Sequence, residues 1–338
     1  MSKTARKIFT ALWICIGLLS GANVTAANND FTISGPYTKN NLSFYLIHGE
    51  DRIKDQNYLT LGEALQQKKV RVYETSNVNQ LSIQNLSKTD FIYIQAGDIV
   101  KGGKQDRVFS TDMVLEPGSG KIRIDSFCVE QGRWQKRGNE SVAEFNSSTK
   151  KLVSKDLRLA ARHKKDQSEV WREVAKTQDK LSEKVGREVK ARESESSLQL
   201  ALENNNLTAR IVEYKKSLAN LPESKQDVIG YAFAVNGKLN TADMYANHNL
   251  FLKLWPKILD SAATESLAEY DEKLQFNVPD KTVIARWMKD AEKGRKNTTQ
   301  LKQGLHQDTR ENAENVQFET YSGKGENKKL YRKNIIRK

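Results

Sequence analysis

Residues 97–107, GDIVKGGKQDR, place three glycines, three cations and two aspartates directly after the apolar run FIYIQA. Consecutive backbone N–H groups at Gly102 and Gly103, with cationic side chains around them, are suited to holding an anion. The later block CVEQGRW adds another arginine and a tryptophan that would form a wall. The residues predicted to contact the ligand are Gly102, Gly103, Lys104, Gln105, Arg107, Arg133 and Trp134.

Acid/base chemistry is the main alternative for the same stretch. Asp106 and Glu130 lie near the ends of strands that we expect to be neighbours, so their carboxylates could work as a pair on a phosphoester or glycosidic bond. A plain hairpin with solvated charges also fits the two adjacent glycines. Cys128 is most simply a small buried side chain, because a strand interior does not promise a reactive thiolate.

Several familiar sites are excluded by spacing. A phosphate-binding P-loop needs Gly, four residues, then Gly-Lys-Ser/Thr opening a helix. Here Gly103-Lys104 is followed by Gln105, and RVFSTDMVL after it has the pattern of a strand. The chain contains no GxGxxG, HExxH or GxSxG, and its four histidines are scattered without ligand spacing. The sequence therefore predicts no metal site, disfavours a serine hydrolase, and leaves any cofactor unknown.

The elements that would position these residues are mostly short strands. Between residues 42 and 134, β-branched and aromatic runs alternate with turn signals, and FIYIQAGDIV and RVFSTDMVLEP each have the pattern of one strand. The exception is TLGEALQQK, 60–68, where Thr60 and Glu63 predict a helix with a capping box.

Helical spacing dominates after residue 150. It predicts helices over 166–185, 207–221, 247–270 and 278–294, with Asp166 or Ser168 capping the first and Asp280 the last. Asn236-Gly237 predicts a tight hairpin within 227–245. A second, polar hairpin is expected around Ser322–Gly325.

These patterns predict an α+β fold with a mostly antiparallel N-terminal β layer and a helical C-terminal half that carries further hairpins. No linker rich in proline, glycine or serine separates the halves, so we expect a single domain. Its boundaries are 42–338, β-rich over 42–150 and helical over 151–338, after a lead at 27–41.

Residues 1–26 have the pattern of a cleaved secretory signal, with three cations before the run IFTALWICIGLLSGA and the small residues Val24-Thr25-Ala26 at its end. An uncleaved anchor is the alternative. The prediction is export to the periplasm or outside the cell, with no membrane span after cleavage. Cys128 would then be the only cysteine, so no internal disulfide could form.

The charge balance favours an anionic partner. The first 26 residues carry three of the 55 cations and no acid, so 52 basic against 42 acidic residues leave a net charge of +10. The cations cluster at 150–165 and 328–338, but neither run interleaves aromatic residues as a groove for single strands does. A small anionic ligand is therefore expected, and nucleic acid is disfavoured.

Six segments, taken in order, resemble the ARG and rhodanese-phosphatase-superfamily-associated protein domain, from about Leu42 to the C-terminus. They are LTLGEAL, GDIVKGGKQDRVF, FCVEQGRW, QSEVWREV, GYAFAVNGKL and LFLKLWPKILDSAATESL. The function of that family is unassigned, so no catalytic residue carries over. The family's name implies a ligand related to phosphates or nucleotides. The motif positions that stand out are Gly97, Asp98, Gly102, Gly103, Gln105, Asp106, Arg107, Cys128, Glu130, Arg133 and Trp134.

Three functions follow as expectations. The first is an exported ligand-binding or sensor-type domain with a polar pocket for a phosphate- or nucleotide-related anion. The second is a hydrolase that uses Asp106 and Glu130. The third is a structural or interaction protein of the cell envelope that uses its basic segments on anionic polymers.

Overall fold

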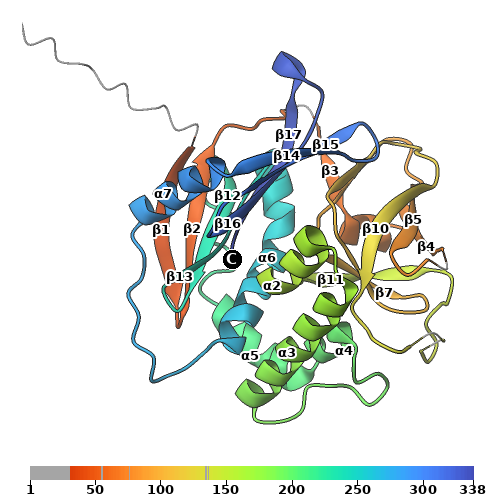
Figure 1. Cartoon of the computed structure of the whole chain (residues 1–338), viewed down its shortest axis with the longest axis horizontal. Coiled ribbons are helices and arrows are strands. Elements are labelled where there is room, and N and C mark those ends of the chain that lie inside the picture. Colours follow the sequence, from red (N-terminus) through yellow and green to blue (C-terminus); the bar gives the residue numbers. More distant parts are fainter. Residues whose placement is uncertain (1–30, 55, 76, 134, 136) are drawn as a thin grey trace, which may run out of the picture. The chain divides into compact units, whose positions relative to one another are not determined.

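The computed structural model describes residues 31–338 except 55, 76, 134 and 136. Its largest element is an eight-stranded sheet in which all neighbouring strands are antiparallel (Figure 1). In spatial order the strands are β1 (Phe31–Lys39), β2 (Leu42–Gly49), β12 (Val228–Val235), β13 (Lys238–Tyr245), β17 (Lys329–Arg337), β16 (Asn315–Ser322), β15 (Leu305–Glu311) and β14 (Arg295–Gln300). Strand β1 precedes the expected domain start at Leu42 and pairs with β2.

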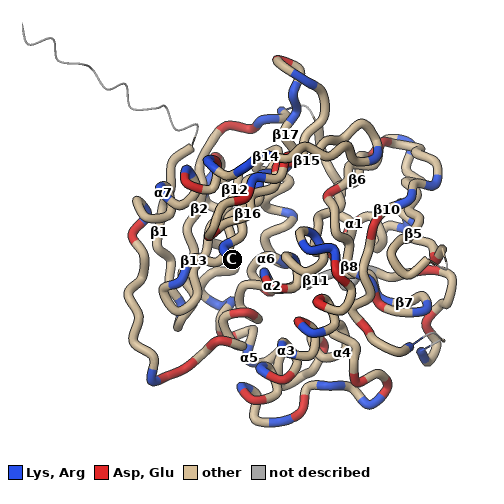
Figure 2. Tube along the Cα trace, in the orientation of Figure 1, with Lys and Arg blue, Asp and Glu red and all other residues tan. Residues whose placement is uncertain are grey.

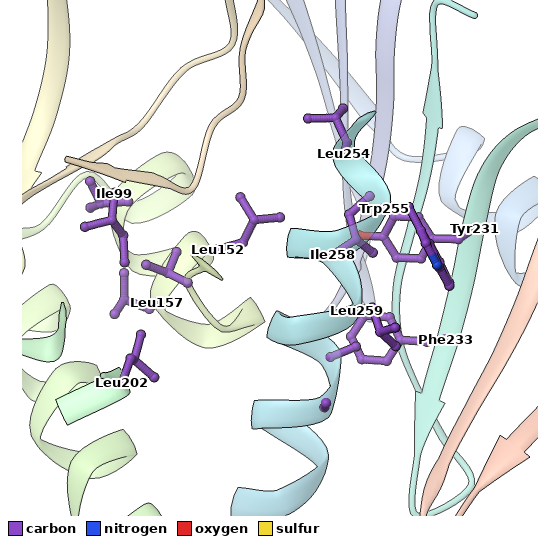
Figure 3. Packing of buried hydrophobic residues seen from close by; sticks show 14 of the residues in the cluster. Ile99, Leu152, Leu157, Leu202, Tyr231, Phe233, Leu254, Trp255, Ile258 and Leu259 are labelled. Atoms are coloured by element: carbon purple, nitrogen blue, oxygen red, sulfur yellow. The ribbon is translucent and has the colours of Figure 1, made fainter. Parts of the chain in front are cut away.

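Helices cover both faces of this sheet because its central strands are apolar on both sides. In β2, Phe44 faces the same cluster as Trp255 of helix α6 (His248–Ala268), whereas the next residue, Tyr45, faces Trp287 of α7 (Lys281–Glu292). This alternation is the period of a strand buried on both faces. Figure 3 shows Trp255, Ile258 and Leu259 of α6 directed at Tyr231 and Phe233 of the sheet.

The N-terminal β layer consists of two smaller sheets. One has the order β11 (Phe145–Leu152), β7 (Asp98–Gly102), β8 (Arg107–Phe109), β10 (Ile122–Cys128), β5 (Gln80–Asn85) and β4 (Val70–Glu74). The other has the order β3 (Tyr58–Thr60), β6 (Phe91–Ile94) and β9 (Met113–Leu115), with β3 and β6 parallel. The layer is therefore antiparallel apart from this one pair of described strands.

Two expected strands are each divided between these two sheets. The single strand predicted over FIYIQAGDIV is wrong: Gly97 has a φ of +100° and the Asp98 N–H donates to the Gln95 carbonyl, so the chain turns between β6 and β7. The single strand over RVFSTDMVLEP is also wrong, because β8 ends at Phe109 and β9 begins at Met113. Local periodicity does not show such a change of partner sheet.

The remaining helices are α1 (Leu61–Gln66), α2 (Lys155–Arg158), the π-helix η1 (Leu159–Lys164), α3 (Gln167–Val185), α4 (Leu198–Leu202), α5 (Asn205–Lys215) and the 3-10 turn η2 (Gly325–Asn327). The predicted caps at Thr60, Asp166 and Asp280 are confirmed, including the capping box of Thr60 with Glu63. The Asn236-Gly237 turn is confirmed too, since both residues have positive φ. Helix α5 ends earlier than the expected residue 221.

Charges of both signs are spread along most of the trace (Figure 2). In the part of the chain that is described, no helix is both long and apolar enough to cross a membrane. The predicted signal at 1–26 lies outside the described residues.

The close pairing of β12 with β13 gives a prediction for stability. A Cβ added at Gly230 would lie 2.1 Å from the carbonyl oxygen of Asp243, so Gly230→Ala should force the two strands apart and lower the free energy of unfolding by about 2 to 3 kcal/mol. At Gly120, where no atom lies within 4 Å of the added Cβ, the same change should alter stability by less than about 0.5 kcal/mol. Urea unfolding followed by circular dichroism measures both, and equal losses would contradict the expectation.

Candidate functional site

The two motif blocks singled out in the sequence, 97–107 and 128–134, do come together. Cys128, the last residue of β10, is paired with Arg107, the first residue of β8, which brings the residues after β10 into contact with the residue before β8. The N–H of Asp106 donates to Oε2 of Glu130 at 3.0 Å, and the N–H of Val129 donates to the Asp106 carbonyl. The antiparallel pairing of β8 with β10 thus brings the two blocks together.

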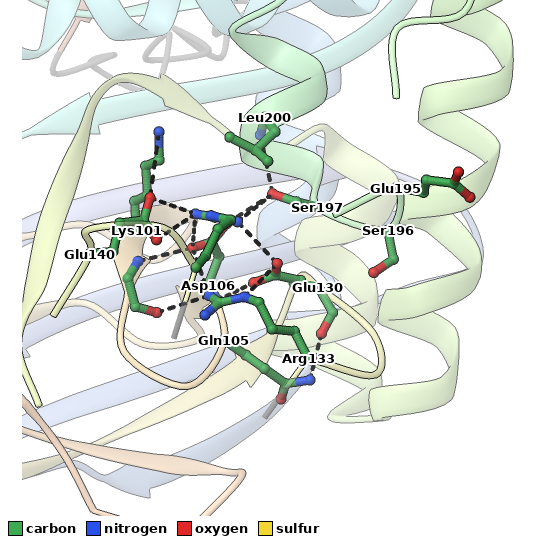
Figure 4. A network of polar contacts seen from close by, with 12 residues as sticks. Lys101, Gln105, Asp106, Glu130, Arg133, Glu140, Glu195, Ser196, Ser197 and Leu200 are labelled. Carbon is green, nitrogen blue, oxygen red and sulfur yellow. Dashed lines mark hydrogen bonds and ion pairs between the residues drawn. The ribbon is translucent and has the colours of Figure 1, made fainter. Parts of the chain in front are cut away.

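Two arginines hold the paired carboxylates of Asp106 and Glu130 (Figure 4). Arg137 donates from Nη2 to Asp106 Oδ1 at 3.0 Å and from Nη1 to Glu130 Oε1 at 3.0 Å, and Arg133 Nε donates to Glu130 Oε1 at 2.7 Å. The Ser197 hydroxyl donates to Asp106 Oδ2 at 2.9 Å. Both carboxylates have no exposed surface and are paired from within the chain, in a cluster called here the closed network. Among the described arginine atoms of this cluster, the one buried donor without a hydrogen-bond partner is Nε of Arg137.

Sequence reasoning missed Arg137 and Ser197. Ser197 is 91 residues from Asp106 and caps α4, so no local spacing points to it. Arg137 lies in the same basic run as Arg133. Because two buried acids require about two cations, a second arginine in this run could have been predicted to join the site.

The environments of the two acids shift their pKa values in opposite directions. Burial raises the pKa of Asp106 and the charge of Glu130 adds to this, against the hydrogen bonds from Arg137. Burial would also raise the pKa of Glu130, but the hydrogen bond from Arg133 and others outweigh it and the pKa is lowered. Such divergence is a pattern of acid/base pairs, yet here neither carboxylate has surface that a substrate could reach.

The predicted anion cradle is occupied by the protein's own groups. The Gly102 N–H donates to Asp106 Oδ1 at 2.9 Å, and the Gly103 N–H donates to the Ser141 carbonyl at 3.0 Å. Gln105 donates from Nε2 to the Glu130 carbonyl at 2.8 Å.

Arg107 is buried in the same region, where its Nη1 donates to the Gln105 carbonyl and its Nη2 lies 3.7 Å from Glu74. Its Nε and Nη2 have no hydrogen-bond partner among the described residues, but it faces Glu74 rather than either pocket described below. The backbone N–H of Lys104 donates to Glu74. Trp134 lies outside the described residues. Cys128 is buried, and burial raises the pKa of its thiol.

An open hollow borders the closed network, with Arg133 and Arg137 on one side and Glu193 and Glu195 on the other. Both arginines already donate to carboxylates and carbonyls, and the two glutamates offset their charge. The hollow is therefore poorly suited to an anion.

A second cavity, of about 810 Å³, has the charge that an anion requires. We call it the basic pocket. It is formed by η1, β14, β15, β16 and Lys338, and brings together the two basic runs at 150–165 and 328–338. Its lining residues are Arg162, His163, Lys165, Arg295, Lys296, Asn297, Thr299, Gln307, Thr309, Glu311, Asn312, Phe318 and Lys338.

Cations outnumber acids in this lining by five to one, with histidine counted as neutral. Lys338 pairs with Glu311 at 2.5 Å, and Lys296 pairs at 2.8 Å with Asp308, which lies outside the lining. Lys165 and Arg295 have no acidic partner among the described residues. The pocket thus keeps positive charge after its ion pairs are subtracted.

The floor of the basic pocket is the guanidinium of Arg162, which is 3% exposed and lies 4.2 Å from the centre of the Phe318 ring. Its Nη2 donates to Asp112 at 2.7 Å and its Nε to Gln307 at 3.1 Å, but its Nη1 is buried without a hydrogen-bond partner among the described residues. Burial lowers the pKa of Arg162 and the charge of Arg332 adds to this, against Asp112.

Asp112 connects this floor to the rest of the fold. Its carboxylate accepts hydrogen bonds from the Ala96 N–H (2.9 Å), Arg332 Nη1 (2.8 Å), Arg162 Nη2 (2.7 Å) and Thr320 Oγ1 (2.8 Å). Burial alone would raise its pKa, but Arg162 and Arg332 hold that pKa well below its usual range. One carboxylate therefore serves two guanidiniums, and Arg332 has a second acid in Asp243, whereas Arg162 has no second acid in the described part of the chain.

No three of histidine, cysteine, aspartate and glutamate gather into a possible metal site in the described ranges.

Comparison with known families gives one match. The model of the ARG and Rhodanese-Phosphatase-superfamily-associated Protein domain matches residues 30–336, nearly the whole chain. A search of curated proteins and a search of solved structures find no match.

The closed network predicts a large effect of Arg137→Leu. This variant leaves two buried carboxylates with one guanidinium between them, so the free energy of unfolding should fall by about 3 to 5 kcal/mol. The matched control is Arg172→Leu, which removes an exposed partner of Glu169 and should cost less than about 1 kcal/mol. Chemical unfolding measures both, and a loss at Arg137 no larger than the control would contradict the assignment.

Glu130 should also contribute a pH-dependent stabilisation. Because its pKa in the folded chain lies below the ordinary value of 4.5, the stabilisation is complete above that value and is lost as the pH falls through the lower, folded pKa. The raised pKa of Asp106 acts in the opposite sense, so the comparison is between the wild type and Glu130→Gln. The variant should be less stable at about pH 7 and lose less stability than the wild type between about pH 5 and 3. Parallel pH profiles would contradict this.

Proposed function

The chain belongs to the family of the ARG and Rhodanese-Phosphatase-superfamily-associated Protein domain, and we propose that it binds a small phosphate-bearing anion in the basic pocket. The observation that carries the proposal is the excess of cations in the lining, which includes Arg162, whose buried Nη1 has no hydrogen-bond partner among the described residues. The family name supports a phosphate-related ligand only by association.

The energetic argument begins with this unpaired donor. A buried donor without an acceptor costs about 1 to 3 kcal/mol, and more when the group is charged. A phosphate oxygen would supply a charge-assisted acceptor, for which a guanidinium has the matching geometry. The stacking of Arg162 on Phe318 holds the guanidinium plane in place before the ligand arrives. Because Nη1 is itself buried, a ligand oxygen would reach it only once a neighbouring side chain of the lining had moved aside.

The surrounding side chains supply the remaining contacts. Lys165 and Arg295 are exposed at the edge of the pocket and have no acid partner in the described part of the chain. Asn297 and Thr299 of β14 add neutral donors. Several cations around one cavity raise the local concentration of anions and speed their association at low salt. This arrangement favours a multiply charged anion such as a phosphate ester over a carboxylate.

Export belongs to the proposal as well, and it rests on the pattern of residues 1–26 alone. The hydrolase alternative requires Asp106 and Glu130 to contact a substrate. Both carboxylates are completely buried, which disfavours this alternative. The alternative of an envelope protein that binds anionic polymers uses the same basic runs. A pocket of about 810 Å³ matches the size of a small ligand, whereas a polymer would need an extended cationic surface.

Calorimetric titration with phosphate, pyrophosphate, AMP and ADP tests the proposal. The wild type should bind at least one of them, and Arg295→Glu should weaken that binding at least about tenfold, because it places an acid at the pocket edge. Arg286→Glu on the exposed side of α7 changes the net charge equally and should leave the affinity within about twofold.

Absence of binding by the wild type to all four ligands would contradict the proposal. Equal weakening by Arg295→Glu and Arg286→Glu would also contradict it, because it would reduce the effect to the overall charge of the protein.

A further inference from the structure

A third cavity, of about 260 Å³, lies away from both charged clusters, between α6 and the segment formed by β11, α2, α3 and α4. We call it the apolar pocket. Leucines form one wall, from which the pocket takes its name, with Leu152, Leu157 and Leu202 on the side opposite α6 in Figure 3, and polar and charged side chains form much of the rest. The tip of the β12–β13 hairpin closes another side with Val235 and Leu239.

The sequence of α6 explains why this space exists. The helix faces the sheet with large side chains, including Phe251, Trp255 and Leu259. Toward the apolar pocket it presents Ser261, Thr264 and Ala268, which have helical spacing and are too small to fill the gap between α6 and β11. The pocket is partly open to solvent, and elements that pack closely normally leave no gap of this size between them, so the small residues on this face call for an explanation.

One acid reaches the apolar pocket from the same face of α6. Glu265 accepts a hydrogen bond at Oε1 from the Lys155 N–H at 3.0 Å and at Oε2 from Asn240 Nδ2 at 2.9 Å. Each oxygen keeps a further lone pair for a donor. Burial raises the pKa of Glu265, against the charge of Arg158, so a second acid beside it would be strongly disfavoured.

The other charges around this pocket are compensated. Four lysines and four acids, Glu265 among them, line it. At the mouth, Lys176 of α3 lies 3.6 Å from Asp156 of α2, and Lys180 of α3 pairs with Glu269 of α6. In contrast to the basic pocket, this lining offers no net charge to an ion.

We propose that the apolar pocket is a second ligand site, which takes an uncharged small molecule with an apolar body and a hydroxyl group that donates to Glu265. The leucine wall suits the apolar body of the ligand. The balanced charges of the rim give no advantage to an ion, and a carboxylate on the ligand would be repelled by Glu265. Sites for small molecules commonly combine apolar walls with a few such polar groups. The inference is independent of the proposed anion site, which has different residues and the opposite electrostatics.

Three ligands of equal length but different head groups test this: 1-octanol, octanoate and octylammonium, each displacing the uncharged fluorescent reporter N-phenyl-1-naphthylamine. We expect 1-octanol to displace the reporter at concentrations at least about tenfold lower than either ion. Failure of 1-octanol to displace the reporter, or equal potency of octanoate, would overturn the proposal.

Two variants locate the effect. Thr264→Leu places a larger side chain in the cavity and should weaken the binding of 1-octanol at least about tenfold. The control Val212→Leu enlarges an apolar side chain on the exposed face of α5 and should leave the affinity for 1-octanol within about twofold. Glu265→Gln keeps the shape of the side chain and should reduce the preference for 1-octanol over octanoate to about threefold or less.

An unchanged preference in Glu265→Gln would overturn the role of Glu265, even if Thr264→Leu failed to fold. Arg295→Glu should not alter the displacement by 1-octanol, so failure of the anion site and failure of this site are distinguishable.

Discussion

The buried carboxylate of Asp112 is the point at which the separate parts of this fold are joined. It follows β8 and precedes β9, so it belongs to the N-terminal β layer, yet its partners Arg332 and Thr320 come from β17 and β16 of the eight-stranded sheet. Arg162 reaches it from η1. Removing a partner of such a buried group costs about 3 to 5 kcal/mol, since it leaves a charge without compensation. The packing of one layer on the other therefore depends on this residue.

The two buried polar clusters differ in how their charges are matched, and this difference accounts for the proposed function. In the closed network, Asp106 and Glu130 face Arg133 and Arg137, and both carboxylates are enclosed. At Asp112 one carboxylate serves two guanidiniums, and among the described residues only Arg332 gains a second acid, Asp243. Arg162, which lines the basic pocket, keeps a buried donor that has no hydrogen-bond partner among the described residues. The first arrangement stabilises the fold, whereas the second retains a cationic group for a ligand.

The sequence predicted correctly those caps and turns that depend on residues close to one another in the chain. The caps at Thr60, Asp166 and Asp280 and the turn at Asn236-Gly237 depend on residues within a few positions of one another, and all four are confirmed. The α+β class followed from the change of period near residue 150 and is confirmed as well. The division of 91–100 between two sheets could not be predicted, because the strand pattern is the same whichever partner each half chooses.

The candidate site could also be predicted only in part. The contact of Asp106 with Glu130 could be predicted from the sequence, since it requires only that two strands lie side by side. The basic pocket could not be predicted, because it brings η1 beside β14, β15 and Lys338. Arg162 of η1 contacts Gln307 of β15, which is 145 residues away in the chain. The basic runs at 150–165 and 328–338 were visible in the sequence, but their convergence depends on the sheet order β17-β16-β15-β14.

The central claim is that Arg162 holds an anion at the basic pocket. The most direct measurement is anomalous diffraction from crystals soaked in tungstate, a heavy analogue of phosphate, with unsoaked crystals as the control. The account predicts an anomalous peak within hydrogen-bond distance of Arg162 Nη1, of about 3 Å, with Lys165 or Arg295 as a second contact. Tungstate bound in the hollow beside Arg133 and Arg137, with the basic pocket unoccupied, would contradict it.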